Sequence, residues 1–483
     1  KPHGEIKRIN TRLTLNNKTP LVIFIIDIKR EKDASNYIFY IHAMSNNNDT
    51  LQTIAGVLGT VLEWYDFAIY GYFSDTIAKV FFPPSNDGHD NLILSYLVFG
   101  SAFVMRPIGG VITGHIGDKL GRKRALVFAL FSMVLPTVAM GCLPTYEQVG
   151  GWSTALLVIC RMLQGFSAGG QLPSSLVYTL EQKPKEHWGY YGSVVNMASN
   201  SGVMIGNLVV AIIRQVLNDD QLFRWGWRVA FISGISVLPL AIYLRLYGKE
   251  HNPNEAVYND DGTIKSDESD EHDSNEQAGV GIYGAPPASS LQQQQQKHPL
   301  REATKRENLR SLLSSALVPM LYGGGYYLSV VWMAIFMGKL VDPPVNGAFW
   351  VNLVCNIFGL TGMSFLAGWL SDHVGRVRTM VVGAISAAIA GPFMVYIISQ
   401  GNTLNALFAQ FTLCCCVSLY AGPSLTWLVE SFPPHVRLTS VALGFNVGMC
   451  ISSGFSPAVA TAMVKISPSA PGFLYPIFGI LGL

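Results

Sequence analysis

Four ionisable residues lie in otherwise uncharged, apolar stretches of this sequence of 483 residues: Glu63, Asp66, Arg106 and Arg161. Glu63 and Asp66 are three residues apart, so on a helix they share one face with Tyr70. In an apolar medium an acid can bind and release a proton, and an arginine can bind a carboxylate through two parallel hydrogen bonds. The four residues therefore suggest a buried site for a proton and a carboxylate.

A structural interpretation of the same residues is also open. Glu63 and Asp66 could form a permanent ion pair with Arg106 that holds two helices together. The Pro-Ile-Gly-Gly sequence after Arg106 favours this role for that arginine, because small residues let helices pack closely. For Arg161 we favour contact with a bound ligand, and for at least one of the two acids we favour proton binding.

The composition indicates which solvent surrounds these residues. Charged residues make up 13% of the chain and hydrophobic residues 49%, whereas soluble domains carry about 25% charged residues. Residues 1–43 hold 12 of the charges and residues 248–310 hold 19, which leaves 33 in the other 377 residues. Such a chain needs a lipid bilayer around it. Soluble enzymes, fibrous proteins and nucleic-acid-binding proteins are excluded.

The apolar stretches predict an all-α integral membrane protein with twelve helices, because a membrane helix needs about 20 apolar residues. The last stretch is about 13 residues long, so we expect the chain to stop inside its twelfth helix. The predicted helices cover residues 52–78, 91–116, 124–143, 152–180, 188–214, 226–247, 311–338, 346–370, 378–399, 403–430, 436–465 and 471–483.

Polar segments divide the chain into four parts. Residues 1–50 are a polar segment outside the fold; either Met44 is the true start or the segment is a disordered basic tail. Residues 51–247 form a first six-helix bundle, and residues 311–483 form a second, incomplete one. Residues 248–310, with 12 acidic and 7 basic residues and the run Gln292–Gln296, are a disordered linker.

Helix geometry places the four ionisable residues at similar depth. At 1.5 Å per residue, Glu63 lies about 16 Å, Asp66 about 21 Å and Arg106 about 15 Å from one membrane surface, and Arg161 lies about 14 Å from the other. Basic residues in the short loops number nine on one side and three on the other. Basic loops face the cytoplasm, so we expect a plasma-membrane protein with both termini cytoplasmic.

The two bundles repeat two short motifs. Gly117–Arg124 (GDKLGRKR) follows the second helix and Ser371–Arg378 (SDHVGRVR) follows the eighth, with an offset of 254 between Asp118 and Asp372. Glu181–Pro184 and Glu430–Pro433 end the fourth and tenth helices. Two motifs that each recur at nearly the same sequence separation indicate duplicated halves in parallel orientation. This architecture suits alternating access to a site between the halves.

These motifs resemble those of the major facilitator superfamily, and the fit is closer to its metabolite:proton symporter group. The resemblance rests on the GDxxGR[KR] loop and on Glu63–Phe67, Arg106–Gly110 and Arg161–Gly170. It implies a fold of twelve transmembrane helices in two bundles, and a monomer that needs no cofactor or metal. It also implies symport of a proton with a small organic acid or zwitterionic osmolyte such as proline, betaine or 2-oxoglutarate.

One position departs from the family pattern. The family commonly has Gly-Gly-Glu where this chain has Gly169-Gly170-Gln171, so a proton-carrying role cannot be transferred to Gln171. We expect Gln171, Tyr65, Tyr70 and Trp332 to contact the substrate beside Arg161. Aromatic residues such as Trp64, Tyr326 and Tyr327 could form a cage for a quaternary ammonium, or could simply pack the helices.

The repeated loops are expected to act as a conformational gate, as the resemblance implies. Alternatives to symport are a facilitator for another solute class, such as sugars, and a non-transporting membrane sensor on the same scaffold. The run Glu63–Phe67 disfavours the sugar facilitator. The gate residues are Gly117, Asp118, Gly121, Arg122, Glu181, Asp372, Gly375, Arg376, Glu430 and Arg437.

Overall fold

The computed structural model describes residues 26–29, 38–41, 47–85, 88–120, 122–181, 183–237, 309–432 and 437–483. Within these ranges the side chains of residues 26–59, 88, 114–126, 130, 178, 236, 237 and 309 are left out of the description. The chain divides into two units, residues 1–52 and residues 53–483. Most of the predicted linker 248–310 lies outside the described residues.

The first unit contains a two-stranded antiparallel sheet. Strand β1 (Ile26–Lys29) pairs with β2 (Ile38–Ile41), and Ile26 lies opposite Ile41. The expected all-helical chain did not include these strands. Both segments are short and contain β-branched or aromatic residues at alternate or adjacent positions, which favours an extended backbone over a helix.

The first half of the second unit consists of helices joined by short loops and turns. Short 3₁₀ turns at Lys185–His187 and Ser233–Val237 and a π-helical turn at Leu222–Gly226 join or extend the α-helices. The α-helices are α1 (Asn47–Tyr72), α2 (Ser74–Val80), α3 (Gly88–Leu120), α4 (Arg122–Cys142), α5 (Tyr146–Val149), α6 (Gly151–Ala168), α7 (Gln171–Glu181), α8 (Trp188–Val216), α9 (Asp219–Gln221) and α10 (Trp227–Ile232).

The second half contains more π-helical backbone. π-Helical turns cover Leu321–Gly325, Leu328–Trp332, Phe336–Leu340 and Cys355–Gly362, and a 3₁₀ turn covers Ala470–Phe473. The α-helices are α14 (Leu309–Leu317), α15 (Met333–Ile335), α16 (Ala348–Val354), α17 (Met363–Val374), α18 (Arg376–Ser399), α19 (Thr403–Glu430), α20 (Arg437–Ser452), α21 (Ser456–Val464) and α22 (Leu474–Gly482).

Seven helical segments among the described residues are long and apolar enough to cross a membrane. Two shorter apolar helices cover Val127–Cys142 and Ala470–Gly482. The seven segments are His89–Thr113, Lys185–Val216, Arg310–Leu340, Ala348–Val374, Arg376–Ile398, Thr403–Glu430 and Arg437–Val464.

Several predicted continuous helices are interrupted. The first breaks at Phe73, between α1 and α2. The fourth predicted helix breaks at Gly169 and Gly170, between α6 and α7, and the eleventh breaks between α20 and α21. The Gly323–Gly325 run lies in a π-helical turn. The break between α20 and α21 contains Gly454. Glycine weakens a helix because its backbone loses the most freedom when it is ordered, so these three irregularities lie where the sequence weakens the helix.

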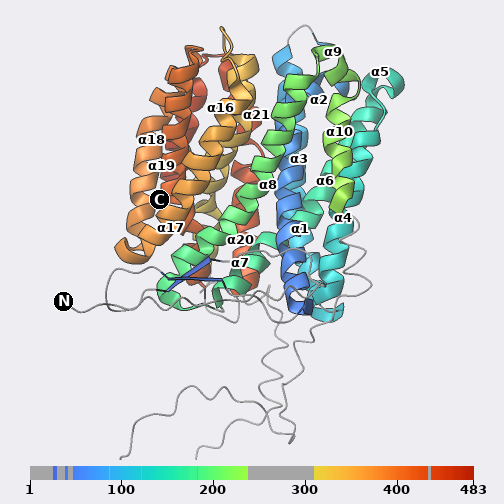
Figure 1. The fold of residues 1–483 in the computed structure, drawn as a ribbon. Helices are drawn as coiled ribbons and strands as arrows, with labels where there is room; N and C mark the ends of the chain where they lie inside the picture. Colours follow the sequence, from blue (N-terminus) through green and yellow to red (C-terminus); the bar gives the residue numbers. More distant parts are fainter. Residues whose placement is uncertain are drawn as a thin grey trace, which may run out of the picture. The chain divides into compact units, whose positions relative to one another are not determined.

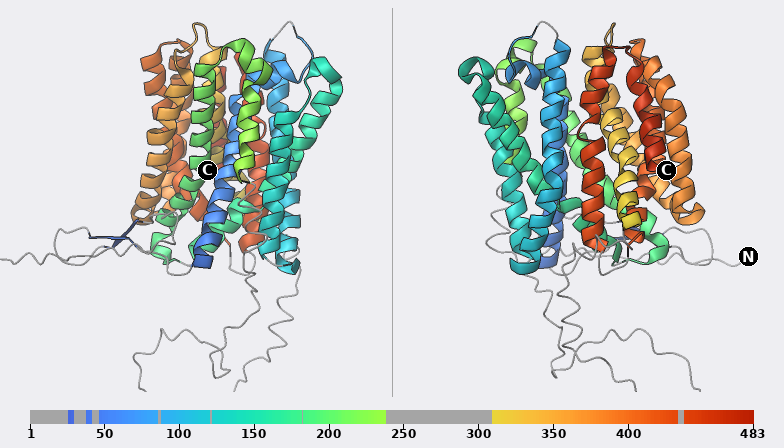
Figure 2. Two further views of the ribbon diagram at one scale, coloured as in Figure 1. Left: turned by 45° about the vertical axis from the view of Figure 1, so that its right-hand side comes forward. Right: turned by 180° about the vertical axis from the view of Figure 1, so that it is seen from behind.

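The helices of the two halves form two groups that lie side by side (Figure 1). The right-hand view of Figure 2 shows the same two groups, with most helices of residues 60–235 on one side and most helices of residues 310–483 on the other. Helix α8 packs against α17, α19 and α16 of the second half. Helix α3 packs against α20 and α21. These contacts make the interface between the halves.

Glycines set the spacing between α3 and α6. A Cβ atom at Gly165 would collide with the carbonyl oxygen of Ala102, and one at Gly169 would collide with the carbonyl oxygen of Arg106. Only glycine fits at such a close backbone approach. The approach brings Arg106 on α3 and Arg161 on α6 to the same part of the bundle.

Candidate functional site

The two acids of α1 form two separate, fully buried ion pairs. Arg106 Nη2 lies 2.7 Å from Glu63 Oε1, and Arg161 Nη1 lies 3.0 Å from Asp66 Oδ2. All four side chains are at most 1% exposed. The sequence suggested a pairing of both acids with Arg106. The structure divides the acids between two arginines because α3 and α6 both reach α1.

Asp66 has further partners on two other helices. Gln164 donates to Asp66 Oδ1 at 2.8 Å and to Thr137 Oγ1 at 2.9 Å, and its own carbonyl accepts from Arg161 Nη1 at 2.8 Å. Both carboxylate oxygens of Asp66 therefore accept hydrogen bonds. The network ties α1, α4 and α6 together.

Arg161 uses only one side of its guanidinium group for these bonds. Its Nη1 serves both Asp66 and Gln164, while Nε and Nη2 are buried and have no hydrogen-bond partner among the described residues. The faces of three rings lie around the group, with Tyr70, Phe67 and Phe99 centred 4.3, 4.9 and 5.5 Å from Cζ. An open Nε–Nη2 edge is the edge that binds a carboxylate with two hydrogen bonds.

Gln171 contacts Glu63. In the amide orientation that satisfies both ends, Gln171 Nε2 donates to Glu63 Oε2 at 3.2 Å, and its oxygen accepts from the backbone N–H of Thr60 at 3.1 Å. The residue follows the break at Gly169 and Gly170, which starts α7 beside α1. An amide can donate to a charged carboxylate, so Gln171 suits an ionised Glu63.

Aromatic side chains from both halves meet beside the ion pairs. The Trp64 ring lies 5.7 Å from the Tyr326 ring and 6.3 Å from the Tyr327 ring. Phe99 lies 5.4 Å from Tyr327. Trp64 Nε1 and the Tyr327 hydroxyl are buried and lack a hydrogen-bond partner among the described residues. We call Trp64, Tyr322, Tyr326 and Tyr327 the aromatic cluster.

Two asparagines of α8 hold the aromatic cluster. The Tyr322 hydroxyl donates to Asn196 Oδ1 and the Tyr326 hydroxyl donates to Asn200 Oδ1, both at 3.0 Å. The two tyrosines are four residues apart, and so are the two asparagines. The two hydrogen bonds therefore lie one helical turn apart and join the halves.

Two residues expected at the substrate bond away from the ion pairs. The Tyr65 hydroxyl donates to the carbonyl of Ala230 at 3.0 Å, so this side chain points toward α10. Trp332 donates to Thr461 Oγ1 at 3.0 Å and stacks on Phe336 at 4.6 Å, so it lies within the second half. Tyr65 and Trp332 therefore have partners away from the two ion pairs, and their contact with the substrate stays a prediction.

Neutral groups make the polar interior of the second half. Gln410 Nε2 donates to Asn352 Oδ1 and to the carbonyl of Ser329. Asn352 and Asn356 donate to the Tyr72 hydroxyl at 3.2 and 3.4 Å, which joins α1 to the second half. The charged residues that are buried within the described ranges are the four site residues of the first half and Arg437.

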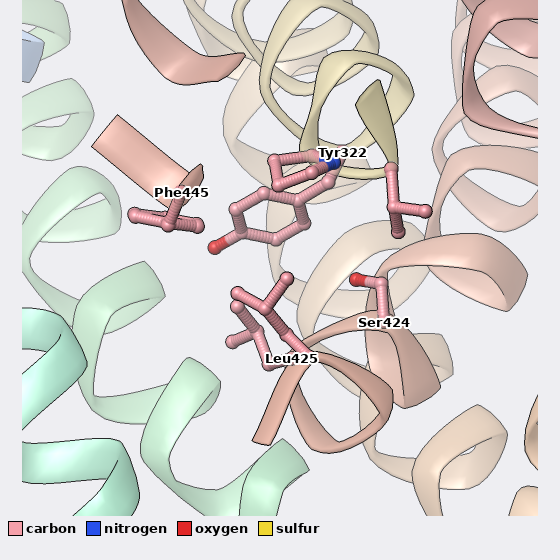
Figure 3. Close-up of a pocket in the computed structure, with 7 residues that line it drawn as sticks. Tyr322, Ser424, Leu425 and Phe445 are labelled. Atoms are coloured by element: carbon pink, nitrogen blue, oxygen red, sulfur yellow. The ribbon is translucent and has the colours of Figure 1, made fainter. Parts of the chain in front are cut away.

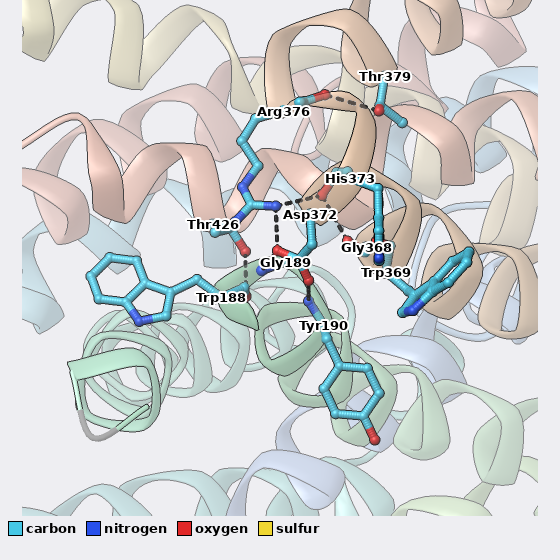
Figure 4. Close-up of polar contacts among 12 residues, drawn as sticks. Trp188, Gly189, Tyr190, Gly368, Trp369, Asp372, His373, Arg376, Thr379 and Thr426 are labelled. Atoms are coloured by element: carbon cyan, nitrogen blue, oxygen red, sulfur yellow. Dashed lines mark hydrogen bonds and ion pairs between the residues drawn. The ribbon is translucent and has the colours of Figure 1, made fainter. Parts of the chain in front are cut away.

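Asp372, from the second repeated loop, binds the start of α8. Its two carboxylate oxygens accept the backbone N–H groups of Gly189 and Tyr190, both at 2.9 Å (Figure 4). The first N–H groups of a helix lack intrahelical partners and carry positive potential, so an anion is stabilised there. Arg376 donates to the same carboxylate and to Ser371. The Asp372 contact joins the two halves.

Two further ion pairs lie at this end. Arg376 Nε lies 3.3 Å from Glu430 Oε1, and Arg437 Nη1 lies 2.7 Å from Glu181 Oε1. Gly375 has φ +106°, a conformation that favours glycine, and it joins α17 to α18. The side chains of the first repeated loop, including Gly117, Asp118, Gly121 and Arg122, lie outside the described residues.

The two halves also touch at the opposite end. Lys465 Nζ lies 2.6 Å from Asp90 Oδ1, and Trp350 donates to Gln215 Oε1 at 3.0 Å. Described residues therefore join the halves on both sides of the aromatic cluster.

Of two small pockets, the first is lined by the second half alone and the second by both halves. Neither has room for a water molecule, whereas typical ligand sites have volumes of roughly 300–1,000 Å³. Tyr322 and Ser424 contribute polar atoms to the first pocket (Figure 3). The first is lined by Val318, Pro319, Tyr322, Ser424, Leu425, Leu428 and Phe445, and the second by Leu172, Pro173, Leu176, Leu425, Leu428, Val441 and Phe445.

Sequence reasoning missed several partners. It did not assign roles to Thr137, Gln164, Asn196, Asn200 or Tyr322. Gln164 lies three residues from Arg161, and the asparagines are four residues apart in an apolar helix. These spacings place each set on one helix face, which is a usable signal.

The fold and the site define a multi-pass helical membrane protein built of two similar halves around a buried polar site. Residues 58–458 match the family profile described as Major Facilitator Superfamily. The chain belongs to this superfamily of membrane transporters, as its motifs predicted, and the predicted fold of twelve transmembrane helices in two bundles is confirmed.

Relatives of this chain include transporters with different named substrates. A proline/betaine transporter of Salmonella typhimurium is 27% identical over 433 residues, covering 89% of this chain and 81% of the relative. An alpha-ketoglutarate permease of Escherichia coli is 29% identical over 443 residues, covering 89% and 91%. The solved xylose transporter XylE from E. coli has a TM-score of 0.64 at 17% identity, covers 90% of this chain and 98% of that chain, and supports the fold alone.

Proposed function

We propose that this protein is a secondary active transporter that couples a proton to a small organic acid or zwitterionic osmolyte by alternating access. The observation that carries the proposal is the pair of buried acid–arginine contacts, Glu63–Arg106 and Asp66–Arg161, beside an aromatic cluster supplied by both halves. Buried ionisable groups in a membrane protein are costly and typically serve proton or substrate binding. The named activities of the relatives support this class.

We assign proton binding to Glu63 and Asp66 and substrate binding to Arg161. Protonation of an acid would release its arginine, and a substrate carboxylate could take the open edge of Arg161. Arg106 is the charge partner of Glu63. The Tyr70 ring packs against the Arg161 guanidinium group, and the Gln171 amide donates a hydrogen bond to Glu63.

The contacts of Asp372 and Arg437 act as the gate on one side. They must break for the site to open there, and the contacts of Lys465 and Trp350 must break for it to open on the other. Basic residues gather in the loops on the Asp372 side, so we propose that this side faces the cytoplasm. We propose a monomer in the plasma membrane, with both termini cytoplasmic.

Uptake tests the function. In a transport-deficient host, labelled proline, glycine betaine, 2-oxoglutarate and citrate are offered with and without an uncoupler. We expect saturable accumulation of at least one compound, abolished by the uncoupler. Saturable uptake that the uncoupler leaves unchanged indicates a facilitator and overturns the symport proposal, and the absence of uptake favours the sensor.

A further inference from the structure

An acid that the proposed mechanism does not use lies near the end of the molecule where Trp350 meets Gln215. Arg214 of α8 donates to both carboxylate oxygens of Asp75 in α2, and their side chains are 11% and 13% exposed. Asp66, in contrast, is fully buried. A proton that enters from this end therefore has to cross protein before it reaches Asp66, and Asp75 is the shallower of the two acids.

Polar side chains follow one helix face between the two acids. Asp66, Tyr70 and Ser74 are each four residues apart, so they lie one above another, about 6 Å apart along the helix axis. The break between α1 and α2 keeps helical hydrogen bonding, because the Phe73 N–H group donates to the Ile69 carbonyl at 3.0 Å. The polar face therefore continues from the buried site toward the shallower acid.

Helix α3 adds further hydroxyl groups beside this face. The Tyr70 hydroxyl donates to the Ser95 carbonyl at 3.0 Å, and the Tyr96 hydroxyl lies near Ser74 and Asp75. The hydroxyls of Ser74, Ser95 and Tyr96 are buried, and none completes a hydrogen bond among the described residues. Ordered water commonly serves such groups, and it needs roughly two to four polar partners. The three hydroxyls can supply these partners.

We infer that Asp75 is the acid at which protons enter, and that the hydroxyls of Ser74, Tyr96 and Tyr70, bridged by water, carry them to Asp66. This inference rests on the proposed function, because it concerns delivery of the coupled proton. A hydroxyl group can accept one hydrogen bond and donate another. A chain of hydroxyls and water molecules can therefore pass a proton along without any member changing its charge.

The transfer balances in protons and in charge. Asp75 first takes a proton from water. An O–H bond then forms at Asp66 while the O–H bond at Asp75 breaks, and each hydroxyl or water between them gains one proton and loses another. Asp75 is again a carboxylate paired with Arg214, and the protonated Asp66 can release Arg161. Positive charge from Arg214 and Lys339 lies near Asp75 and attracts its carboxylate once the proton has left.

A purely structural role for the Asp75–Arg214 pair makes a different prediction. Arg214 also lies over the Phe349 ring of the second half, with Cζ 4.6 Å from the ring centre. The pair could therefore hold the halves together at this end without moving a proton. The Tyr96 hydroxyl separates the two roles, because it makes no hydrogen bond between the halves among the described residues.

Tyr96→Phe tests the route by removing a single oxygen atom. Because the hydroxyl has no hydrogen-bond partner among the described residues, we expect the melting temperature to stay the same or rise slightly. Parent and variant are compared in intact, de-energised cells of the transport-deficient host with an imposed acid-outside pH gradient. The labelled probes are proline, glycine betaine, 2-oxoglutarate and citrate.

We expect Tyr96→Phe to lower the initial rate of accumulation at least about ten-fold, because a positioned proton carrier has been removed. The final level of accumulation should match that of the parent, since Glu63 and Asp66 remain and the route affects only the rate. Asp75→Asn is expected to lower the initial rate as well. Tyr96→Phe decides the question if Asp75→Asn does not fold.

Two further measurements distinguish proton delivery from structure. Counterflow of labelled against unlabelled probe at equal pH needs no net proton movement, so Tyr96→Phe should match the parent. Heavy water should slow accumulation by the variant more than by the parent, because proton transfer limits the variant. The matched control is Tyr475→Phe, which removes a buried hydroxyl bonded to Ser329 in the second half and should leave the initial rate near that of the parent.

The outcomes separate this inference from the proposed function. If the parent accumulates a probe and Tyr96→Phe does so at the same initial rate, the route is overturned and proton-coupled transport stands. An equal loss of accumulation and counterflow in Tyr96→Phe indicates a structural role and also overturns the route. If the parent accumulates none of the four probes under the gradient, both the inference and the proposed function fail.

Discussion

The two halves share one architecture but differ in the chemistry of their interiors. The first half buries two ion pairs among α1, α3 and α6. The described interior of the second half is joined by neutral bonds, such as those of Gln410 to Asn352 and of Ser329 to Tyr475. Its charged contacts lie at helix ends, where Asp372 and Arg376 meet.

We infer from this difference that both halves kept the helical shape that movement requires, whereas the buried charged site belongs to one half. Rocking of two bundles needs similar shapes and breakable contacts at both ends. A buried charge costs free energy wherever it is placed, and the proposed proton coupling requires buried acids in only one half. Movement of the second half therefore separates opposite charges only at the ends, in pairs such as Arg437–Glu181 and Lys465–Asp90 among the described residues.

The largest expected effect concerns Asp66. Asp66→Leu leaves Arg161 buried without a counter-charge, so we expect the free energy of unfolding to fall by about 3–5 kcal/mol. Thermal unfolding in detergent measures it. The matched control is the double variant Asp66→Leu, Arg161→Met, which removes both charges and is expected to regain most of the stability without transport. A single variant as stable as the parent contradicts the comparison of the halves.

Glu63→Gln is expected to act on coupling as well as on stability. The side chain keeps its size, but Arg106 loses a charged acceptor, at a cost of about 1.5–3 kcal/mol. Because the amide carries no exchangeable charge, we expect loss of accumulation against a gradient while exchange of internal for external substrate continues. Asp66→Asn is tested in parallel. If both variants accumulate substrate fully, the assignment of proton binding to α1 is wrong.

Asp372→Asn probes charge at the end of the second half. The amide keeps one acceptor for the N–H groups of α8 and loses the charge that the helix start and Arg376 favour, so we expect a loss of about 1–2 kcal/mol in the contact between the halves. A cysteine is introduced at Ser371 in both the parent and the variant. The rate at which a thiol reagent labels this cysteine measures how readily the halves separate at the Asp372 end. Faster labelling in the variant is expected; equal labelling indicates that the contact does not hold the halves together.

Gln410→Leu probes the neutral interior of the second half. It removes the hydrogen bonds to Asn352 and Ser329. Interhelical hydrogen bonds in membrane proteins contribute about 0.6 kcal/mol on average and about 1.7 kcal/mol at most, so we expect a small loss of stability. Uncoupler-sensitive accumulation should remain. Loss of proton dependence in this variant, with Glu63 and Asp66 intact, contradicts a neutral role for the second half.

The sequence could predict the four buried ionisable residues, because each is a charge in an apolar stretch long enough to span a membrane. It could also predict the two halves and their family from repeated motifs. The partners of each acid could not be predicted. Glu63 and Asp66 share a helix face, and only the approach of α3 and α6, set by Gly165 and Gly169, decides which arginine each acid meets.

Irregular helical backbone explains why the sequence did not predict the neighbours of the other site residues. The π-helical turns between Leu321 and Leu340 change which side chains face the first half, so Tyr326 and Tyr327 reach Trp64 while Trp332 does not. A regular helical period misses such shifts, because each π-helical turn takes up an extra residue. The break at Gly169 and Gly170 likewise places Gln171 beside Glu63, a contact that spacing alone does not reveal.

The smallest expected effect is at the Arg437–Glu181 pair. The Glu181 side chain is 43% exposed, and exposed ion pairs contribute about 0.2–1 kcal/mol. Glu181→Gln should therefore leave the melting temperature nearly unchanged, and high salt should reduce even that difference because the pair is screened. Arg437→Gln is the matched control, since Arg437 is largely buried and also donates to the carbonyl of Phe432 at 3.1 Å. If Arg437→Gln lowers the melting temperature more than Glu181→Gln does, the buried arginine is the structural member of the pair. If Glu181→Gln lowers the melting temperature as much as Asp66→Leu does, charges at helix ends and charges in the interior do not differ as we expect.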